Sequence, residues 1–141
     1  MTKRRVLFLC TGNSCRSQMA EGCVKAGMSE YWEAYSAGTH PTGYVHPLAL
    51  QVLREIGIEH QGRSKAIEEI REIPFDIVIT VCDSASEECP IWLGAGQRVQ
   101  ASFPDPASVS GSEAEIITAF RTVRDDILRE IPRILDQITN Q

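Results

Sequence analysis

A short run of apolar residues at positions 6–9 limits the possible folds more than any other feature of this sequence. A continuous apolar run of this length is typical of a strand buried on both faces of a parallel sheet. Polar residues and a glycine break the run, and Ser17 is then a candidate cap for a helix over residues 18–27. The pattern predicts a buried strand, a tight loop and a helix in succession.

Similar strand and helix patterns alternate along the rest of the chain. Pro47 suits the first turn of a helix and Gly57 its end, while Ser64 can cap another helix. The further strands that we expect cover residues 34–37, 75–81 and, more weakly, 98–103, and the helices cover residues 47–56 and 64–70. Because strands alternate with helices, we expect an α/β fold with a parallel sheet and helices on both faces.

The C-terminal part of the chain has the pattern of one long amphipathic helix from Ser112 onward. Its apolar residues recur at steps of three or four, which places them on one helix face. These residues are Ile116, Phe120, Val123, Ile127, Ile131, Ile134 and Ile138. Pro132 lies within the pattern, and we expect it to kink or divide the helix.

Length and charge restrict the class of protein. The 141 residues suit a single domain over residues 1–141, and a hydrophobic content of 43% is enough for an ordinary core. The formal net charge of −5 argues against a nucleic-acid surface, which is normally basic. It also repels anions, so any anionic ligand must be attracted by a local site.

Nothing in the sequence predicts a membrane segment or a secretion signal. No apolar run approaches the roughly 20 residues that span a bilayer, and the apolar stretch after the basic N-terminus is too short for a signal peptide. We therefore expect a cytoplasmic protein whose thiols are kept reduced. Its five cysteines are then catalytic or buried, rather than a secreted disulfide framework. They are Cys10, Cys15, Cys23, Cys82 and Cys89.

Cys10 ends the first apolar run, five residues intervene, and Arg16 and Ser17 open the helix pattern. In this setting successive backbone N–H groups converge on one point, and the helix N-terminus adds partial positive charge. Such a loop binds a tetrahedral oxyanion and favours Cys10 as a thiolate. Arg16 adds a planar fork of donors, and Ser17 can donate to the Cys10 sulfur. The oxyanion-binding residues that we expect are Thr11, Gly12, Asn13, Ser14, Cys15, Arg16 and Ser17.

Asp105 is a second candidate, in a loop that Pro104 and Pro106 stiffen after a predicted strand. In parallel sheets of this type, ligands collect at the carboxyl ends of the strands. A carboxylic acid there could protonate a leaving oxygen. An aspartate between prolines is often only a turn residue, and it is the neighbouring Cys10 loop that favours a catalytic role.

The segment from Cys10 to Ser17, together with Ser36-Ala37-Gly38 and Asp105-Pro106, resembles the low-molecular-weight protein tyrosine phosphatase family over nearly the whole chain. The resemblance implies a three-layer sandwich around a four-stranded parallel sheet in the order 2-1-3-4. It also implies Cys10 as nucleophile, Arg16 as the clamp on the oxyanion and Asp105 as general acid.

Cys82 and Cys89 form a second feature that a phosphatase does not need. Cys82 follows the predicted strand over residues 75–81, so it should emerge at the same sheet edge as Cys10. Two thiols can resolve a covalent intermediate by supplying electrons. Two alternatives are a zinc site, for which six intervening residues exceed the usual spacing, and incidental buried thiols.

The segment from residue 75 to Pro90 is similar to that of thioredoxin-coupled arsenate reductases. That similarity implies attack of Cys10 on arsenate, a Cys10–Cys82 disulfide as arsenite leaves, and then a Cys82–Cys89 disulfide across a mobile segment. It implies electrons from reduced thioredoxin with no bound cofactor or metal, although glutaredoxin or glutathione would serve similar chemistry. Phosphate and sulfate are the expected competing anions, and we expect a monomer.

Two other functions stay open. A tyrosine phosphatase of this family would place aromatic residues after the Asp-Pro pair, where Ala107 and Ser108 stand here. An oxyanion sensor would bind without turnover. The sequence also departs from many of the reductases, because Ser102, Phe103 and Pro104 precede the acid in place of a Trp-Gly-Phe-like run.

The remaining polar candidates are given structural roles. Some of these reductases bind potassium at positions that match Asn13, Glu21 and Ser36, but Lys65 stands where a further ligand is an aspartate. Since an ammonium group cannot ligate a cation, we expect no potassium site and a Lys65–Glu21 pair. We expect Cys15 and Cys23 to be structural. The three histidines, His40, His46 and His60, are expected in surface loops.

Overall fold

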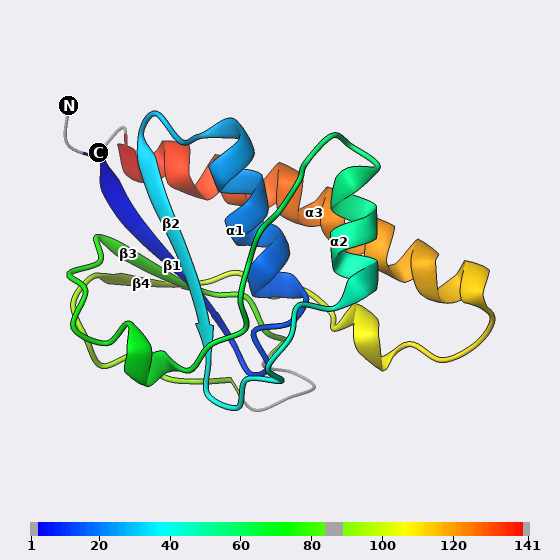
Figure 1. Ribbon diagram of the computed structural model, residues 1–141. Helices are drawn as coiled ribbons and strands as arrows, with labels where there is room; N and C mark the ends of the chain where they lie inside the picture. Colours follow the sequence, from blue (N-terminus) through cyan, green and yellow to red (C-terminus); the bar gives the residue numbers. More distant parts are fainter. Residues whose placement is uncertain (1–2, 84–88, 140–141) are drawn as a thin grey trace.

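The computed structural model describes residues 3–83 and 89–139, which build one four-stranded sheet with helices packed against it (Figure 1). The strands are β1 (Arg4–Cys10), β2 (Trp32–Gly38), β3 (Ile77–Thr80) and β4 (Gln97–Gln100). All neighbouring pairs are parallel, in the order β2-β1-β3-β4. The expected sheet order is therefore confirmed.

The register brings the ends of β1 and β3 to one edge of the sheet. Leu9 lies opposite Thr80, and the Val81 amide donates to the Leu9 carbonyl at 2.8 Å. Cys10, the last residue of β1, and Cys82, which follows β3, consequently lie at the same carboxyl edge of the two central strands. This confirms the expected placement of Cys82.

One face of the sheet is covered by the three α-helices α1 (Arg16–Gly27), α2 (Pro47–Arg54) and α3 (Glu113–Thr139). Val6, Phe8 and Ile79 point into this larger core. The helices contribute fully buried side chains such as Met19 and Ile127, which removes a large apolar area from water.

The other face has a thinner cover. Leu7, Leu9 and Val78 pack there against Trp92 and the 3₁₀-helix η1 (Ile67–Glu69). The expected helical cover on both faces is confirmed, although among the described residues the second face is covered by one short 3₁₀-helix and a loop.

Both serines that we expected to cap helices have other partners. Helix α1 begins at Arg16, and the Ser17 hydroxyl, instead of capping it, lies against Cys10. The helix expected over residues 64–70 is reduced to η1, because the Ser64 hydroxyl donates to the Gly12 carbonyl at 3.1 Å. Loop contacts around the site thus outcompete local capping.

Two element ends also differ from expectation. Helix α2 ends at Arg54, earlier than residue 56, and Gly57 takes a φ of 83° beyond it. Strand β4 ends at Gln100 although the Phe103 amide still donates to the Val81 carbonyl at 3.3 Å.

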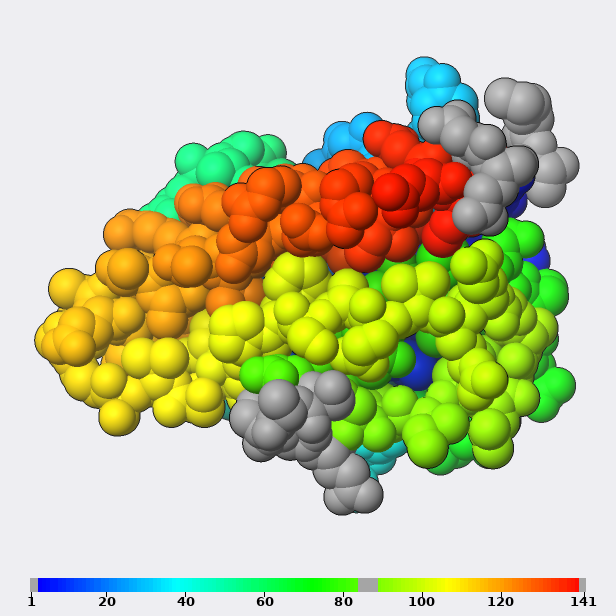
Figure 2. Space-filling model, turned by 180° about the vertical axis from the view of Figure 1, so that it is seen from behind, coloured from blue at the N-terminus to red at the C-terminus, as the bar shows by residue number. Residues whose placement is uncertain are grey.

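Helix α3 runs without a break from Glu113 to Thr139, with Pro132 inside it, so the expected division of the helix is wrong. Ile131 and Leu135 are fully buried on either side of the proline, and this packing outweighs the one hydrogen bond that proline cannot donate. Seen from behind, α3 lies along the segment that contains β4 and the 3₁₀-helix η2 (Pro106–Ser108) (Figure 2).

Within residues 3–83 and 89–139, no helix combines the length and the apolar character that a membrane span requires.

Candidate active site

Cys10 lies 2% exposed at the end of β1, directly before the loop of residues 11–15. Its sulfur is 3.0 Å from the Ser17 hydroxyl, which also accepts a hydrogen bond from Asn13 Nδ2 at 2.8 Å. Because the Ser17 oxygen accepts from Asn13, its own proton can point at the sulfur. Ser17 is therefore arranged to donate to Cys10, as the sequence predicted.

Two backbone features shape this loop. Asn13 has a φ of 50°, a left-handed conformation that asparagine tolerates, and its Oδ1 accepts from the Lys65 amide at 2.9 Å. Gly38 ends β2 so close to the loop that a Cβ there would lie 2.4 Å from the Thr11 carbonyl oxygen. Only glycine permits this approach, which accounts for Gly38 in the sequence motif.

Arg16 is 5% exposed and joins the anion loop to the loop that carries Asp105. Its Nη1 donates to the Phe103 carbonyl at 3.1 Å, and Nη2 lies 4.0 Å from Asp105 Oδ2. One edge of the guanidinium is thereby fixed by the protein, which orients the planar group.

Asp105 stands at the N-terminus of η2, with its side chain 36% exposed. Its Oδ1 accepts from the Ala107 amide at 3.0 Å, so one oxygen caps η2 while Oδ2 faces Arg16. The two prolines and this cap hold the carboxyl group beside Arg16.

These residues surround a pocket of about 160 Å³. It is lined by Cys10, Gly12, Ser14, Cys15, Arg16, Thr42, Tyr44, His46, Asp105 and Ala107. The sequence prediction missed Thr42, Tyr44 and His46. Their segment follows Gly38 at the carboxyl end of β2, where ligands collect in such sheets, and that position could have indicated them.

His46 is partly buried rather than a freely exposed loop residue. Its Nδ1 accepts from the Leu48 amide at 3.1 Å, and its ring centroid is 4.8 Å from that of Phe120. Burial lowers the pKa of His46, although Asp105 acts in the opposite direction. The imidazole is thus a neutral wall of the pocket at pH 7.

The thiols of Cys15 and Cys23 are buried, and burial raises the pKa of each to about 12. Both stay protonated at neutral pH, and a protonated thiol is a poor nucleophile. This chemistry supports the structural roles that we expected for them.

Cys82 and Cys89 form a disulfide with their Cα atoms 6.0 Å apart. Cys82 is fully buried, whereas Cys89 is partly buried at the edge of the larger core. Residues 84–88 between them, for which we expected mobility, lie outside the described residues. Where the structure describes side chains, no three His, Cys, Asp or Glu residues group as metal ligands.

The side chain of Glu21 is 3% exposed and has partners other than the expected one. It accepts from Lys25 Nζ at 2.9 Å and from the Ser36 hydroxyl at 2.7 Å. Lys65 Nζ instead donates to the Arg63 carbonyl at 2.9 Å, so the expected Lys65–Glu21 pair is replaced by Lys25–Glu21.

The other two histidines differ in their exposure to solvent. His40 is exposed, as expected. His60 is not a surface residue, because its side chain is 1% exposed, and that expectation is wrong.

Comparison with known proteins gives one consistent result. The model of the low molecular weight phosphotyrosine protein phosphatase family matches residues 5–141. An arsenate reductase of Halalkalibacterium halodurans is 42% identical over 132 residues, which cover 93% of this chain and 94% of that protein.

Solved structures of arsenate reductases have a similar fold. An arsenate reductase in the phosphate binding state superposes with a TM-score of 0.75 and 29% identity, covering 96% of this chain and 98% of that one. A thioredoxin-dependent arsenate reductase of Corynebacterium glutamicum gives a TM-score of 0.61 and 26% identity, covering 92% of this chain and 62% of that one.

Proposed function

Because the chain belongs to the low molecular weight phosphotyrosine protein phosphatase family, we propose that it reduces arsenate to arsenite, with Cys10 as nucleophile and Cys82 and Cys89 as redox pair. One observation carries the proposal. The Cys82–Cys89 disulfide follows the strand beside β1, at the same sheet edge as the anion pocket of Cys10. Hydrolysis has no use for such a pair, whereas reduction requires two electrons.

The first step forms a bond between sulfur and arsenic. The loop amides and Arg16 hold the oxyanion, and the Cys10 thiolate attacks arsenic. One As–O bond breaks, and Asp105 gives its proton to the leaving oxygen, which departs as water. The Ser17 hydroxyl, 3.0 Å from the sulfur, stabilises the thiolate before attack.

The second and third steps transfer the electrons. The Cys82 thiolate attacks the Cys10 sulfur, the S–As bond breaks, and its electron pair stays on arsenic, which leaves as arsenite. Cys89 then attacks Cys82, releases the Cys10 thiolate and forms the Cys82–Cys89 disulfide that the structure contains. A net two electrons pass from the dithiol to arsenic.

Thioredoxin is the reductant that we propose, acting on the Cys82–Cys89 disulfide without a bound cofactor. A related structure is of a thioredoxin-dependent arsenate reductase, and a dithiol protein is a suitable donor to an internal disulfide. The cytoplasm, which keeps the five thiols reduced, is the proposed compartment, and the proposed form is a monomer.

A weak phosphatase activity is the second candidate. It needs only Cys10, Arg16 and Asp105, which the pocket brings together. Tyr44 lines the same pocket and offers an aromatic side chain, in place of the one missing after Pro106.

The two activities are separated by one set of assays. Purified reduced protein is mixed with arsenate, thioredoxin, thioredoxin reductase and NADPH, and the oxidation of NADPH is followed. Hydrolysis of p-nitrophenyl phosphate is measured in parallel, with Cys10→Ser as the control for both. Arsenate-dependent NADPH oxidation supports the reductase. Hydrolysis alone would favour the phosphatase, and arsenate binding without either activity would favour a sensor.

A further inference from the structure

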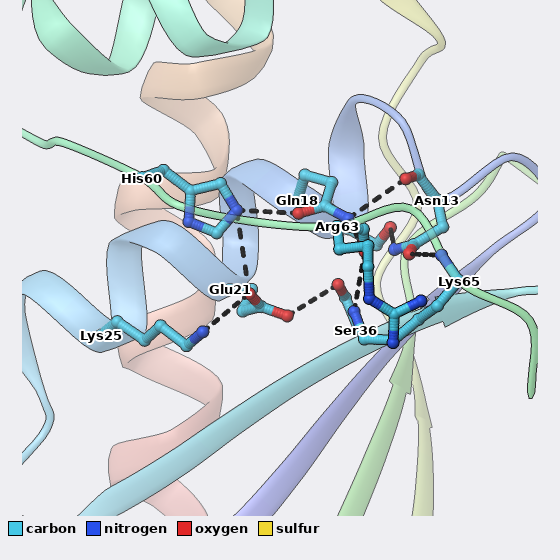
Figure 3. Close-up of polar contacts among 9 residues, drawn as sticks. Asn13, Gln18, Glu21, Lys25, Ser36, His60, Arg63 and Lys65 are labelled. Atoms are coloured by element: carbon cyan, nitrogen blue, oxygen red, sulfur yellow. Dashed lines mark hydrogen bonds and ion pairs between the residues drawn. The ribbon is translucent and has the colours of Figure 1, made fainter. Parts of the chain in front are cut away.

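His60 lies with Gln18 and Glu21 in a buried polar cluster beside α1, and it does not line the anion pocket (Figure 3). Its Nε2 is 2.7 Å from Gln18 Oε1 and 3.7 Å from Glu21 Oε2. Gln18 is itself fully buried at the start of α1. A buried imidazole that contacts two polar side chains is held in one orientation.

The partners of Gln18 determine which proton His60 carries. Gln18 Nε2 donates to two carbonyl oxygens, those of Asn13 at 3.2 Å and Arg63 at 3.1 Å. Because both partners are acceptors, this end of the side chain must be the NH₂ group, and Oε1 must face His60. His60 therefore donates from Nε2–H, and the hydrogen bond between the two side chains has a fixed direction.

Gln18 connects His60 to the reacting sulfur. The Asn13 carbonyl that accepts from Gln18 belongs to the one non-glycine residue of positive φ in the described chain. The Asn13 side chain donates to the Ser17 hydroxyl, and that hydroxyl is 3.0 Å from the Cys10 sulfur. The hydrogen bonds thus run His60 to Gln18, to Asn13, to Ser17, to Cys10.

Two glycines make room for this arrangement. A Cβ at Gly62 would lie 2.3 Å from His60 Nε2 and 2.2 Å from Gln18 Oε1, so a side chain there would displace the hydrogen bond. A Cβ at Gly22 would lie 3.2 Å from the imidazole ring. The ring is enclosed on two sides, so the bond to Gln18 is built into the packing.

We propose that His60 is a positioning residue of the anion loop, whose Nε2–H orients the Gln18 amide so that Asn13 keeps its left-handed conformation and holds Ser17 against Cys10. The residue touches neither substrate nor sulfur and acts through Gln18. The proposal rests on the proposed function only in taking the Cys10 loop as the anion site. The ordinary alternative is that His60 only fills the core.

The test compares two replacements of His60 in the oxidised protein, where Cys82 and Cys89 are bonded. His60→Gln keeps an N–H donor at a similar reach, whereas His60→Leu keeps the bulk and loses the donor. Alkylation of Cys10 by iodoacetamide is followed by peptide mass spectrometry, with and without inorganic phosphate. His40→Leu controls for the loss of an exposed histidine. Val123→Ala controls for loss of stability in the core away from the loop.

Phosphate protection is the deciding readout. We expect the phosphate concentration that halves alkylation to rise about 3- to 10-fold in His60→Leu, the effect of one lost hydrogen bond. It should stay within about twofold of wild type in His60→Gln and in both controls. Gln18→Met removes the same link from its other end, so it should reproduce the loss and serves if His60→Leu does not fold. The double variant His60→Leu/Gln18→Met should lose no more phosphate protection than either single variant.

Several results would overturn the proposal. Protection in His60→Leu equal to that of His40→Leu would do so, as would a loss in His60→Gln as large as in His60→Leu, or additive losses in the double variant. Wild-type protein without phosphate protection would overturn both this proposal and the proposed function. The expected pattern in a protein that does not reduce arsenate would overturn the proposed function alone.

Discussion

At the scale of single residues, the site depends on groups that hold one another before any ligand is bound. Arg16 is fixed by the Phe103 carbonyl and faces Asp105, while Ser17 is fixed by Asn13 and faces Cys10. Because donors of this kind are already oriented, little free energy is spent on reorienting them when charge develops in the transition state.

Asp105→Asn tests the acid without disturbing its loop. The amide oxygen of asparagine can still accept from the Ala107 amide, so the melting temperature should change little. The proton for the leaving oxygen is lost, and we expect arsenate reduction to fall by about 10²- to 10⁴-fold. Steady-state kinetics with thioredoxin and a thermal melt measure both quantities, with Asp136→Asn on α3 as an exposed control. Activity within threefold of wild type would remove Asp105 from the role of acid.

The site residues that were most directly predicted from the sequence lie in one contiguous segment. Cys10, Arg16 and Ser17 have a characteristic spacing directly after a strand, and such a spacing can be recognised in a sequence. The place of Tyr44 in the pocket could not be predicted from such a spacing, because Tyr44 lies in a loop without periodicity. The buried position of His60 uses space left by Gly22 and Gly62, two glycines that are distant from one another in the sequence.

At the scale of elements, the apolar runs correctly predicted β1 and β3, which place Cys10 and Cys82, because strands buried on both faces are apolar throughout. Strand β4 was harder to predict, since its exposed side chains give little pattern. The prediction of a helix that begins at Ser64 was wrong for another reason. The Ser64 hydroxyl contacts Gly12, a residue 52 positions away, and local sequence carries no information about that contact.

Helix α3 gives a prediction at this scale. Pro132 cannot donate a hydrogen bond within the helix, and its ring crowds the backbone carbonyl group of the preceding turn. Pro132→Ala should therefore raise the free energy of unfolding by about 1 to 3 kcal/mol. Urea denaturation measures the change, and arsenate reduction should be unaffected, because α3 places no residue in the pocket. A decrease in stability would show that the proline is required for the course of the helix.

At the scale of the whole molecule, a net charge of −5 repels anions, so the proposed anion site must act through local groups. In the proposed site, the loop amides, the start of α1 and the buried Arg16 would supply that local attraction. The rest of the surface contributes repulsion, which salt screens.

Stability should depend on pH through the buried histidines. Burial lowers the pKa of His60, Lys25 and Lys65 lower it further, and Glu21 opposes them. Below about pH 6.5 the unfolded chain gains a proton on this histidine that the folded chain does not, so folding loses free energy as pH falls. His46 acts in the same direction.

Urea denaturation at pH 7.5 and pH 5.5 measures this effect. Wild-type protein should lose stability between the two, and His60→Gln should lose less. The pKa values of Glu55 and Glu69 are lowered from an ordinary value of 4.5, so both carboxylates titrate mainly below this window and contribute little to the slope. An equal loss in His60→Gln and wild type would show that His60 is not a source of the pH dependence.

We expect the thiol relay to run in one order, in which Cys82 bonds first to Cys10 and only then to Cys89. Disulfides require Cα atoms within about 7 Å, and in the described structure Cys82 satisfies this with Cys89, at 6.0 Å. The proposed relay requires Cys82 to change partner during turnover. Removing the last thiol should stop the relay at its intermediate.

The most direct measurement treats reduced Cys89→Ser protein with one equivalent of arsenate and analyses unreduced peptides by mass spectrometry. The relay predicts one turnover of arsenite and a peptide pair joined through Cys10 and Cys82, which Cys82→Ser should not form. Continued thioredoxin-dependent turnover by Cys89→Ser, with no Cys10–Cys82 peptide pair, would contradict the account.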